Sequence, residues 1–161
     1  MTAQTALEKL GGFLTWLAVV VIAGAVAELV MAKHWEEPVQ LVPFVLCAAA
    51  LAAIAAVRAR PSGPTVRAFW VALTVVPTVS AFGAWEHVQA NGGFMLDRNP
   101  DLSGVSLLVA MLTGRAPVGA PGVMALAAVL ALAGQWAATI AASRSDALRP
   151  PWHPEGIPAG Q

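Results

Sequence analysis

Four long apolar segments alternate with short polar ones along the chain. They cover residues 12–32, 39–57, 68–88 and 122–143. A helix rises about 1.5 Å per residue, so about 20 residues cross the hydrocarbon core of a bilayer, which is about 30 Å thick. The pattern predicts an all-α membrane protein whose four transmembrane helices form a single domain over residues 1–143, followed by a proline-rich tail over residues 144–161.

A fifth apolar stretch, residues 103–113, is too short to span. It lies in the long connection between the third and fourth segments, residues 86–121. Asp101 or Ser103 is a suitable N-cap for it. We expect a short amphipathic or re-entrant helix that covers the outer mouth of the bundle. The Asn-Gly-Gly sequence at residues 91–93 is predicted to form a turn in this connection.

Proline positions refine the predicted spans. Pro43 falls in the first turn of the second span, where a missing N–H is tolerated. Pro77 falls in the middle of the third span and predicts a kink, with Thr74 and Ser80 available to bond the freed carbonyls.

The first segment has a second interpretation. Ala25-Val26-Ala27 has the small-x-small pattern of a signal-peptide cleavage site. The residues before the segment are not clearly basic, since Glu8 stands beside Lys9, and the apolar run continues past Ala27. We therefore expect a retained transmembrane helix and leave cleavage as the alternative.

Composition agrees with a membrane location. The chain is 58% hydrophobic and 11% charged, whereas about a quarter of residues are charged in soluble domains. The formal net charge is zero, so nothing indicates a nucleic-acid partner. The single cysteine, Cys47, excludes an internal disulfide and a site built from several thiolates.

The distribution of Lys and Arg predicts the orientation. Four spans place both termini and the 58–67 loop on one side, which carries six basic residues against three on the other. Positive residues favour the cytoplasmic side. We expect a multi-pass protein of the bacterial inner membrane with cytoplasmic termini. Five tryptophans fall near the predicted span ends, as interface anchors do: Trp16, Trp70 and Trp136 inside, and Trp35 and Trp85 outside.

Small residues at helical spacing predict which faces point inward, because helices associate in lipid through close packing. The predicted faces are Gly24, Ala27, Glu28, Met31 and Trp35 in the first span; Pro77, Ser80, Ala84 and His87 in the third; and Ala128, Ala131, Gln135, Ala138 and Ala142 in the fourth.

Acids and imidazoles near the outer ends of the spans are the candidate ligand or proton-relay residues. They are Glu28, His34, Glu36, Glu86 and His87. Imidazole and carboxylate suit a divalent metal, with Glu28, His34 and His87 as the candidate set. Two histidines also suit haem, and an acid beside a histidine suits proton transfer or a quinone head group. The cofactor therefore stays open.

Simpler interpretations remain for each of these residues: His87 suits a structural role as well as a site, and Glu28 suits a hydrogen bond to a Trp, a Ser or the backbone of a neighbouring span. Glu36 and Glu86 suit solvated positions, and His34 suits an interfacial one. Glu28 is the strongest candidate, because an acid within a span usually has a function. The sequence contains no HExxH or CxxC motif and predicts no catalytic residue.

Three stretches carry a resemblance to known proteins. The first runs from Glu28 to Pro43 and includes His34, Glu36 and Gln40. The second runs from His87 to Gly104 and includes Gln89, Asn91, Phe94, Pro100 and Leu102-Ser103. The third comprises Leu112-Thr113-Gly114, Ala116-Pro117 and Ala120-Pro121-Gly122. In these the chain resembles a family of small four-span bacterial inner-membrane proteins that has no known activity. The resemblance implies the architecture and no mechanism.

Three functional hypotheses follow. The first is a non-catalytic accessory or scaffold subunit, in contact with the lipid bilayer and with a membrane-protein partner or further copies of itself. The alternative is a metal-, haem- or quinone-binding membrane protein with a site at the outer mouth. The third is a subunit of an oligomeric channel or transporter.

Overall fold

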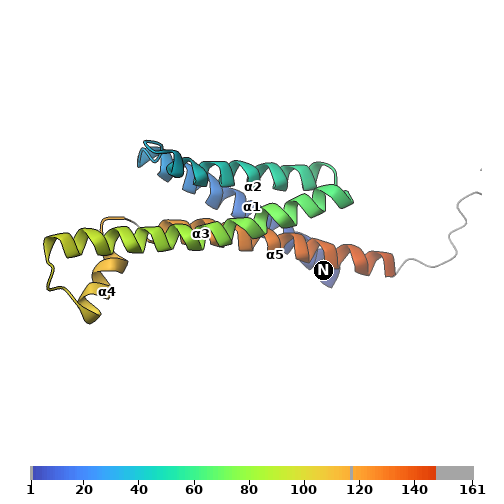
Figure 1. Ribbon diagram of the computed structural model, residues 1–161. Coiled ribbons are helices and arrows are strands. Elements are labelled where there is room, and N and C mark those ends of the chain that lie inside the picture. Colours follow the sequence, from blue (N-terminus) through green and yellow to red (C-terminus); the bar gives the residue numbers. More distant parts are fainter. Residues whose placement is uncertain (1, 117, 148–161) are drawn as a thin grey trace, which may run out of the picture.

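The computed structural model describes residues 2–116 and 118–147, and helices account for most of them (Figure 1). In chain order the elements are α1 (Ala3–Met31), the 3₁₀ turn η1 (Pro38–Leu41), α2 (Val42–Ala59), α3 (Gly63–Arg98), α4 (Gly104–Thr113) and α5 (Gly119–Ala147). Residues 144–147 of the predicted tail belong to α5, and the rest of that tail lies outside the described residues.

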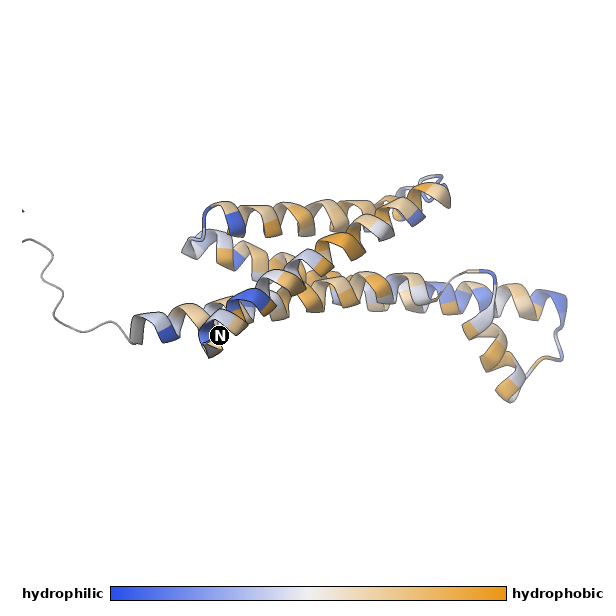
Figure 2. Cartoon of the chain, turned by 180° about the vertical axis from the view of Figure 1, so that it is seen from behind, coloured by the Kyte–Doolittle hydropathy of each residue, from blue (hydrophilic) through white to orange (hydrophobic). Residues whose placement is uncertain are grey.

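Four helical segments are long and apolar enough to cross a membrane: α1, η1 with α2, α3, and α5. Figure 2 shows apolar residues along all four and hydrophilic residues gathered towards their ends. The beginning of α1, the α2–α3 connection and the end of α5 lie at the same end of the bundle (Figure 1). The predicted architecture, four spans with a short apolar helix between the third and fourth, is confirmed.

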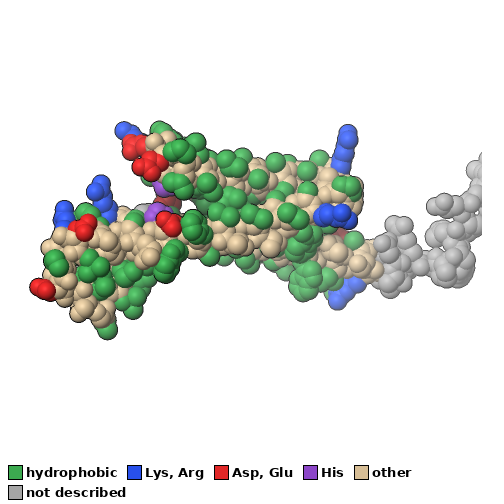
Figure 3. Space-filling model, in the orientation of Figure 1, with side chains coloured by type: hydrophobic (Ala, Val, Ile, Leu, Met, Phe, Trp, Pro, Cys, Tyr) green, Lys and Arg blue, Asp and Glu red, His purple; other side chains and the backbone are tan. Residues whose placement is uncertain are grey.

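The two ends of the bundle differ in charge (Figure 3). We call one the basic end and the other the acidic end. The basic end carries Lys9, Arg58, Arg60, Arg67 and Arg144 together with Glu8, and the acidic end carries Glu28, Glu36, Glu37, Glu86, Asp97 and Asp101 together with Lys33, Arg98 and Arg115.

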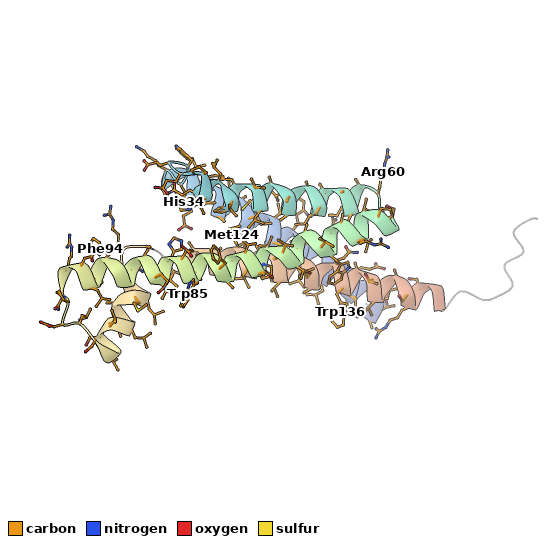
Figure 4. All side chains as sticks on the ribbon, in the orientation of Figure 1. His34, Arg60, Trp85, Phe94, Met124 and Trp136 are labelled. Carbon is orange, nitrogen blue, oxygen red and sulfur yellow. The ribbon has the colours of Figure 1, made fainter. Side chains whose placement is uncertain are left out.

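The tryptophans of the spans are accessible, as membrane-interface anchors must be. Trp85 and Trp136 are 56% and 62% exposed, and they lie towards opposite ends of the bundle (Figure 4). Trp16, Trp35 and Trp70 are also exposed.

The helices begin where the local sequence favours it. The Thr2 hydroxyl accepts a hydrogen bond from the Thr5 N–H at the start of α1, so this helix begins nine residues before the predicted span. Ser62 and Thr65 form a reciprocal capping box at the start of α3. Pro43 lies in the first turn of α2, as predicted.

α1 and α5 approach each other closely at two glycines, Gly11 and Gly134. A Cβ atom on Gly134 would stand 2.8 Å from the Gly11 carbonyl oxygen and 2.6 Å from the Thr15 hydroxyl oxygen. The Thr15 hydroxyl itself donates to the Gly11 carbonyl over 2.8 Å. Because glycine has no side chain, the backbones of α1 and α5 can approach closely, and such close packing stabilises helix association in lipid.

The interior of the bundle is well filled. Phe69 and Leu73 of α3 are almost completely buried. A cavity of about 10 Å³ lies between the four spanning helices and is lined only by apolar side chains, among them Ile22, Cys47 and Met124. This space holds about one water molecule, so it is too small for a haem or a quinone.

The predicted inward face of α1 is wrong. Gly24, Ala27, Glu28, Met31 and Trp35 are all exposed. The residues of α1 that are buried against the bundle are Gly11, Thr15, Ala18, Ile22 and Ala25. Apolar residues surround this helix on every side, so the hydrophobic pattern does not select the contact face.

The predicted inward faces of α3 and α5 are closer to the structure. Ser80 is buried, and Pro77, Ala84 and His87 are half-buried. On α5, Ala128 and Ala131 are buried and Gln135 is half-buried as predicted, whereas Ala138 and Ala142 are exposed and were wrongly placed.

α3 is much longer than the third predicted span. It continues through residues 86–98, which the sequence predicted to be loop, and ends at Asn99, just before Pro100. Pro77 lies inside the helix, and the axis of α3 changes direction near its middle (Figure 1). Thr74 bonds the Trp70 carbonyl and Ser80 has no partner among the described atoms. Neither therefore bonds the Leu73 carbonyl, which Pro77 frees.

α4 has nearly the predicted bounds but a different position. Among the described elements it packs against α3 alone, alongside the extension that reaches beyond the bundle (Figure 1). The expectation that this helix covers the mouth of the bundle is therefore wrong. Ser103 is the N-cap residue, although its side chain makes no capping hydrogen bond.

Candidate functional site at the acidic end

The turn after α1 fixes the position of His34. Lys33 adopts a left-handed conformation with φ of 50°. The His34 N–H donates to the Leu29 carbonyl over 2.9 Å, and the Lys33 N–H donates to the Val30 carbonyl over 3.1 Å. This pair of bonds is a Schellman motif, which normally has glycine at the left-handed position. The motif satisfies the carbonyls at the helix end and holds the His34 backbone in one place.

The two glutamates that follow His34 point into solvent. Glu36 and Glu37 are exposed, and their backbone N–H groups donate to the Gln40 side-chain oxygen over 2.8 Å and 3.3 Å. Pro38 then starts η1. The glutamine is thus the cap of this connection, and the carboxylates are left free to interact with solutes.

His87 comes from the middle of the outer half of α3. It is half-buried, while its neighbour Glu86 is exposed. One turn earlier, Gly83 faces the start of α5: a Cβ there would stand 3.5 Å from the Pro121 ring, which is an ordinary van der Waals distance. This contact fixes α3 beside the start of α5, just below the histidine.

The structure brings His34 and His87 together. His34 points from the turn after α1 towards α3 (Figure 4). The two described histidine side chains lie near each other in a recess at the acidic end, with carboxylates around them (Figure 3). We call them the histidine pair.

The three candidate carboxylates do not join the pair as ligands. Glu28, Glu36 and Glu86 are all exposed. No three histidine, cysteine, aspartate or glutamate side chains within residues 2–116 and 118–147 lie close enough to hold a metal ion together. The proposed set of Glu28, His34 and His87 is therefore not assembled as a three-residue site.

The histidine pair can still bind a ligand chemically. A neutral imidazole offers one nitrogen lone pair to a metal ion or a hydrogen-bond donor. The two rings come from different elements and supply two ligands. The open side of the recess leaves room for water as a further ligand. The acidic end carries six acids against three basic residues, and this net negative charge favours cations.

Asn91 is an important residue whose role the sequence did not reveal. It is 2% exposed and lies inside α3, so the predicted Asn-Gly-Gly turn is wrong. Its amide group donates to the Met111 and Ala116 carbonyls, each over 3.0 Å. Its side-chain oxygen accepts from the Ala116 N–H over 2.8 Å. We call this set of three bonds the Asn91 clamp.

Two glycines make room for the clamp. A Cβ on Gly92 would stand 3.1 Å from the Met111 side chain, and one on Gly114 would stand 2.4 Å from the Asn91 side chain. The glycines therefore serve close packing between α3 and the end of α4. The sequence signal for this packing was the presence of glycine both next to Asn91 and at residue 114.

Comparison with protein families, curated proteins and solved structures finds no match to this chain.

Proposed function

We propose that the chain is a non-catalytic accessory or scaffold subunit of a membrane-protein assembly, and that α4 is the surface that binds its partner. The observation that carries this proposal is a row of large aliphatic side chains exposed on α4. Val105 is 76% exposed, and the others are between 51% and 54% exposed: Leu108, Val109 and Leu112. Their spacing of three, four and seven residues places them on one face, which we call the aliphatic stripe.

Composition favours a protein over lipid as the cover of this stripe. Leu107, Ala110 and Met111 occupy the opposite face and are half-buried, so α4 is apolar on two sides. A helix that is apolar all round is normally buried, either in protein or in the hydrocarbon core of a membrane, and at ten residues α4 is too short to span that core. Helices that lie on a membrane surface usually carry Lys and Arg on their polar face, and α4 contains no charged residue.

Attachment of α4 also supports a docking role. The Asn91 clamp ties the end of the helix to a single projecting element, α3. A fixed helix loses little conformational entropy when a partner binds it. The clamp therefore presents the aliphatic stripe in a form ready for association.

The membrane and the orientation belong to the same proposal. Five basic residues at the basic end, Lys9, Arg58, Arg60, Arg67 and Arg144, against three at the acidic end favour cytoplasmic termini. The resemblance to small four-span bacterial proteins supports the bacterial inner membrane. The acidic end, with α4, then faces the outer side.

Purification of the tagged chain from its native membrane tests the proposal. We expect one membrane protein to co-purify in fixed stoichiometry. The double variant Leu108→Gln, Val109→Gln should lose it, because two amides placed in an apolar contact lack partners. Ser106→Gln is the matched control, since Ser106 is exposed on α4 outside the stripe, and it should keep the partner.

Three results would contradict this assignment. Equal recovery of the partner in the stripe variant and the control would place the contact elsewhere. Recovery of only a second copy of the chain would make α4 a self-association surface. Recovery of lipid alone, with α4 protected by the bilayer, would make it an interfacial helix.

A further inference from the structure

The histidine pair has the features of a metal site that is completed by water. Both described imidazoles of the chain lie near each other in one recess (Figure 3), although their positions are 53 residues apart in the sequence (87 − 34). Both side chains are half-buried, so part of each is accessible to solvent. A solute that enters from the acidic end can therefore reach them.

Each ring is held by a different and independent backbone device. The Schellman motif holds His34, and the long helix α3, packed on Pro121 at Gly83, holds His87. Ligands that are fixed before binding lose less entropy when they coordinate an ion. The backbones that carry the two histidines are thus in place without a ligand.

The ligand type selects the class of ion. Imidazole nitrogen suits divalent zinc, copper and nickel, whereas magnesium and calcium prefer oxygen ligands. Because the described residues do not complete a set of three, the remaining positions on the ion would be filled by water. Exposed Glu28, Glu36 and Glu86 at the same end add attraction for a cation through space and through bound water.

We propose that His34 and His87 together bind one divalent transition-metal ion, of the zinc or copper class, in an open site at the acidic end of the bundle. The site does not depend on the accessory function, because it uses other residues than the aliphatic stripe. It is also distinct from a haem site, since it needs no cavity of cofactor size.

Titration with Zn²⁺ tests the affinity. The full chain, carrying an affinity tag without histidine and placed in lipid nanodiscs, is titrated against a zinc-sensitive dye. We expect one equivalent to bind, and His34→Ala and His87→Ala each to weaken binding by at least tenfold. His153→Ala, which removes the third histidine of the chain, should leave the affinity unchanged.

Electron paramagnetic resonance with Cu²⁺ tests the ligands directly. We expect nitrogen couplings from two imidazoles in the intact chain and in His153→Ala, and from one imidazole in each single variant of the pair. Spectra that are the same in all four proteins, or a loss of affinity only in His153→Ala, would overturn the proposal.

Cross-linking between two introduced cysteines tests whether positions 34 and 87 are close together in a folded chain. In a Cys47→Ala chain, His34→Cys combined with His87→Cys should be joined by a short bifunctional thiol reagent. Each single replacement should give no such product. A folded chain that cannot be joined would show that the two positions do not meet, and the proposal would fall with them. If the cysteines are joined efficiently but His34→Ala and His87→Ala bind Zn²⁺ as tightly as the unchanged chain, the two positions are close together and metal binding by the pair is refuted.

Discussion

Replacement of Asn91 by alanine should release α4 while leaving the bundle intact. The change removes three hydrogen bonds and leaves the Ala116 N–H without its acceptor. A hydrogen bond contributes about 1 kcal/mol net, so three contribute about 3 kcal/mol. Because 1.4 kcal/mol is a factor of ten, local opening of α4 should become roughly 100-fold more frequent.

Hydrogen exchange of the full chain in nanodiscs measures this opening. Amides of residues 104–116 should exchange roughly 100-fold faster in Asn91→Ala, whereas those of α1 and α5 should keep their rates. Gln89→Ala is the matched control, because it removes the same amide group from an exposed position on α3. Asn91→Asp should open α4 at least as much, since a carboxylate oxygen would replace the donor that faces two carbonyls.

The reasoning would be refuted if α4 exchanged at the same rate in Asn91→Ala and in the unchanged chain. That result would mean that contacts of Leu107, Ala110 and Met111 with α3 hold the helix without the clamp. A general rise in exchange across α1 and α5 would instead mean that the α3–α4 unit supports the whole bundle.

Two further predictions concern stability. Gly134→Ala should lower the free energy of unfolding by about 1–3 kcal/mol, because its Cβ would overlap the Thr15 hydroxyl and the α1 backbone. Gly122→Ala is the control and should not destabilise the protein, since a Cβ there meets nothing within 4 Å. Equal unfolding curves in detergent for the two variants would contradict the close crossing of α1 and α5. Lys33→Gly should raise the free energy of unfolding by about 1 kcal/mol, because glycine adopts the left-handed φ without strain. Lys33→Ala is the control and should give no such gain in thermal unfolding. A loss of stability in Lys33→Gly would show that the lysine side chain has a role of its own.

The sequence predicted the spans well because hydrophobic length has a single physical cause. Twenty apolar residues must leave water, and no soluble fold in a chain of this composition offers them enough cover. The number of spans, their order and the extra apolar helix followed directly. The bounds were less accurate, since polar residues before the apolar run of α1 and beyond Trp85 in α3 continue the helix past the predicted span.

The extension of α3 could not be predicted, because local and tertiary preferences conflict there. Gly92 and Gly93 each disfavour a helix by about 1 kcal/mol relative to alanine, and Asn-Gly is typical of a turn. Packing of α4 on Gly92 and the three bonds of Asn91 compensate for this only when both helices are present. Such compensation between residues 20 and more positions apart leaves no mark in a local pattern.

The candidate site was predicted in part. Charge and topology placed His34 and His87 at the same end, and the structure brings their side chains near each other. The inclusion of Glu28 as a third, inward-facing ligand depended on a small-residue stripe on α1. That stripe was a poor guide, because alanine and glycine occur on every side of this helix and its true contacts follow Gly11, Thr15 and Ala18.

Photo-crosslinking from α4 is the most direct test of the central claim that this helix binds a partner protein. A photoreactive residue is placed at Leu108, in the aliphatic stripe, or at Ser106, on the same helix outside it. In native membranes we predict one protein adduct from position 108, weak or absent from position 106, and containing the protein that co-purifies with the chain. Adducts from position 108 that contain only lipid, or equal adducts from both positions, would contradict the account.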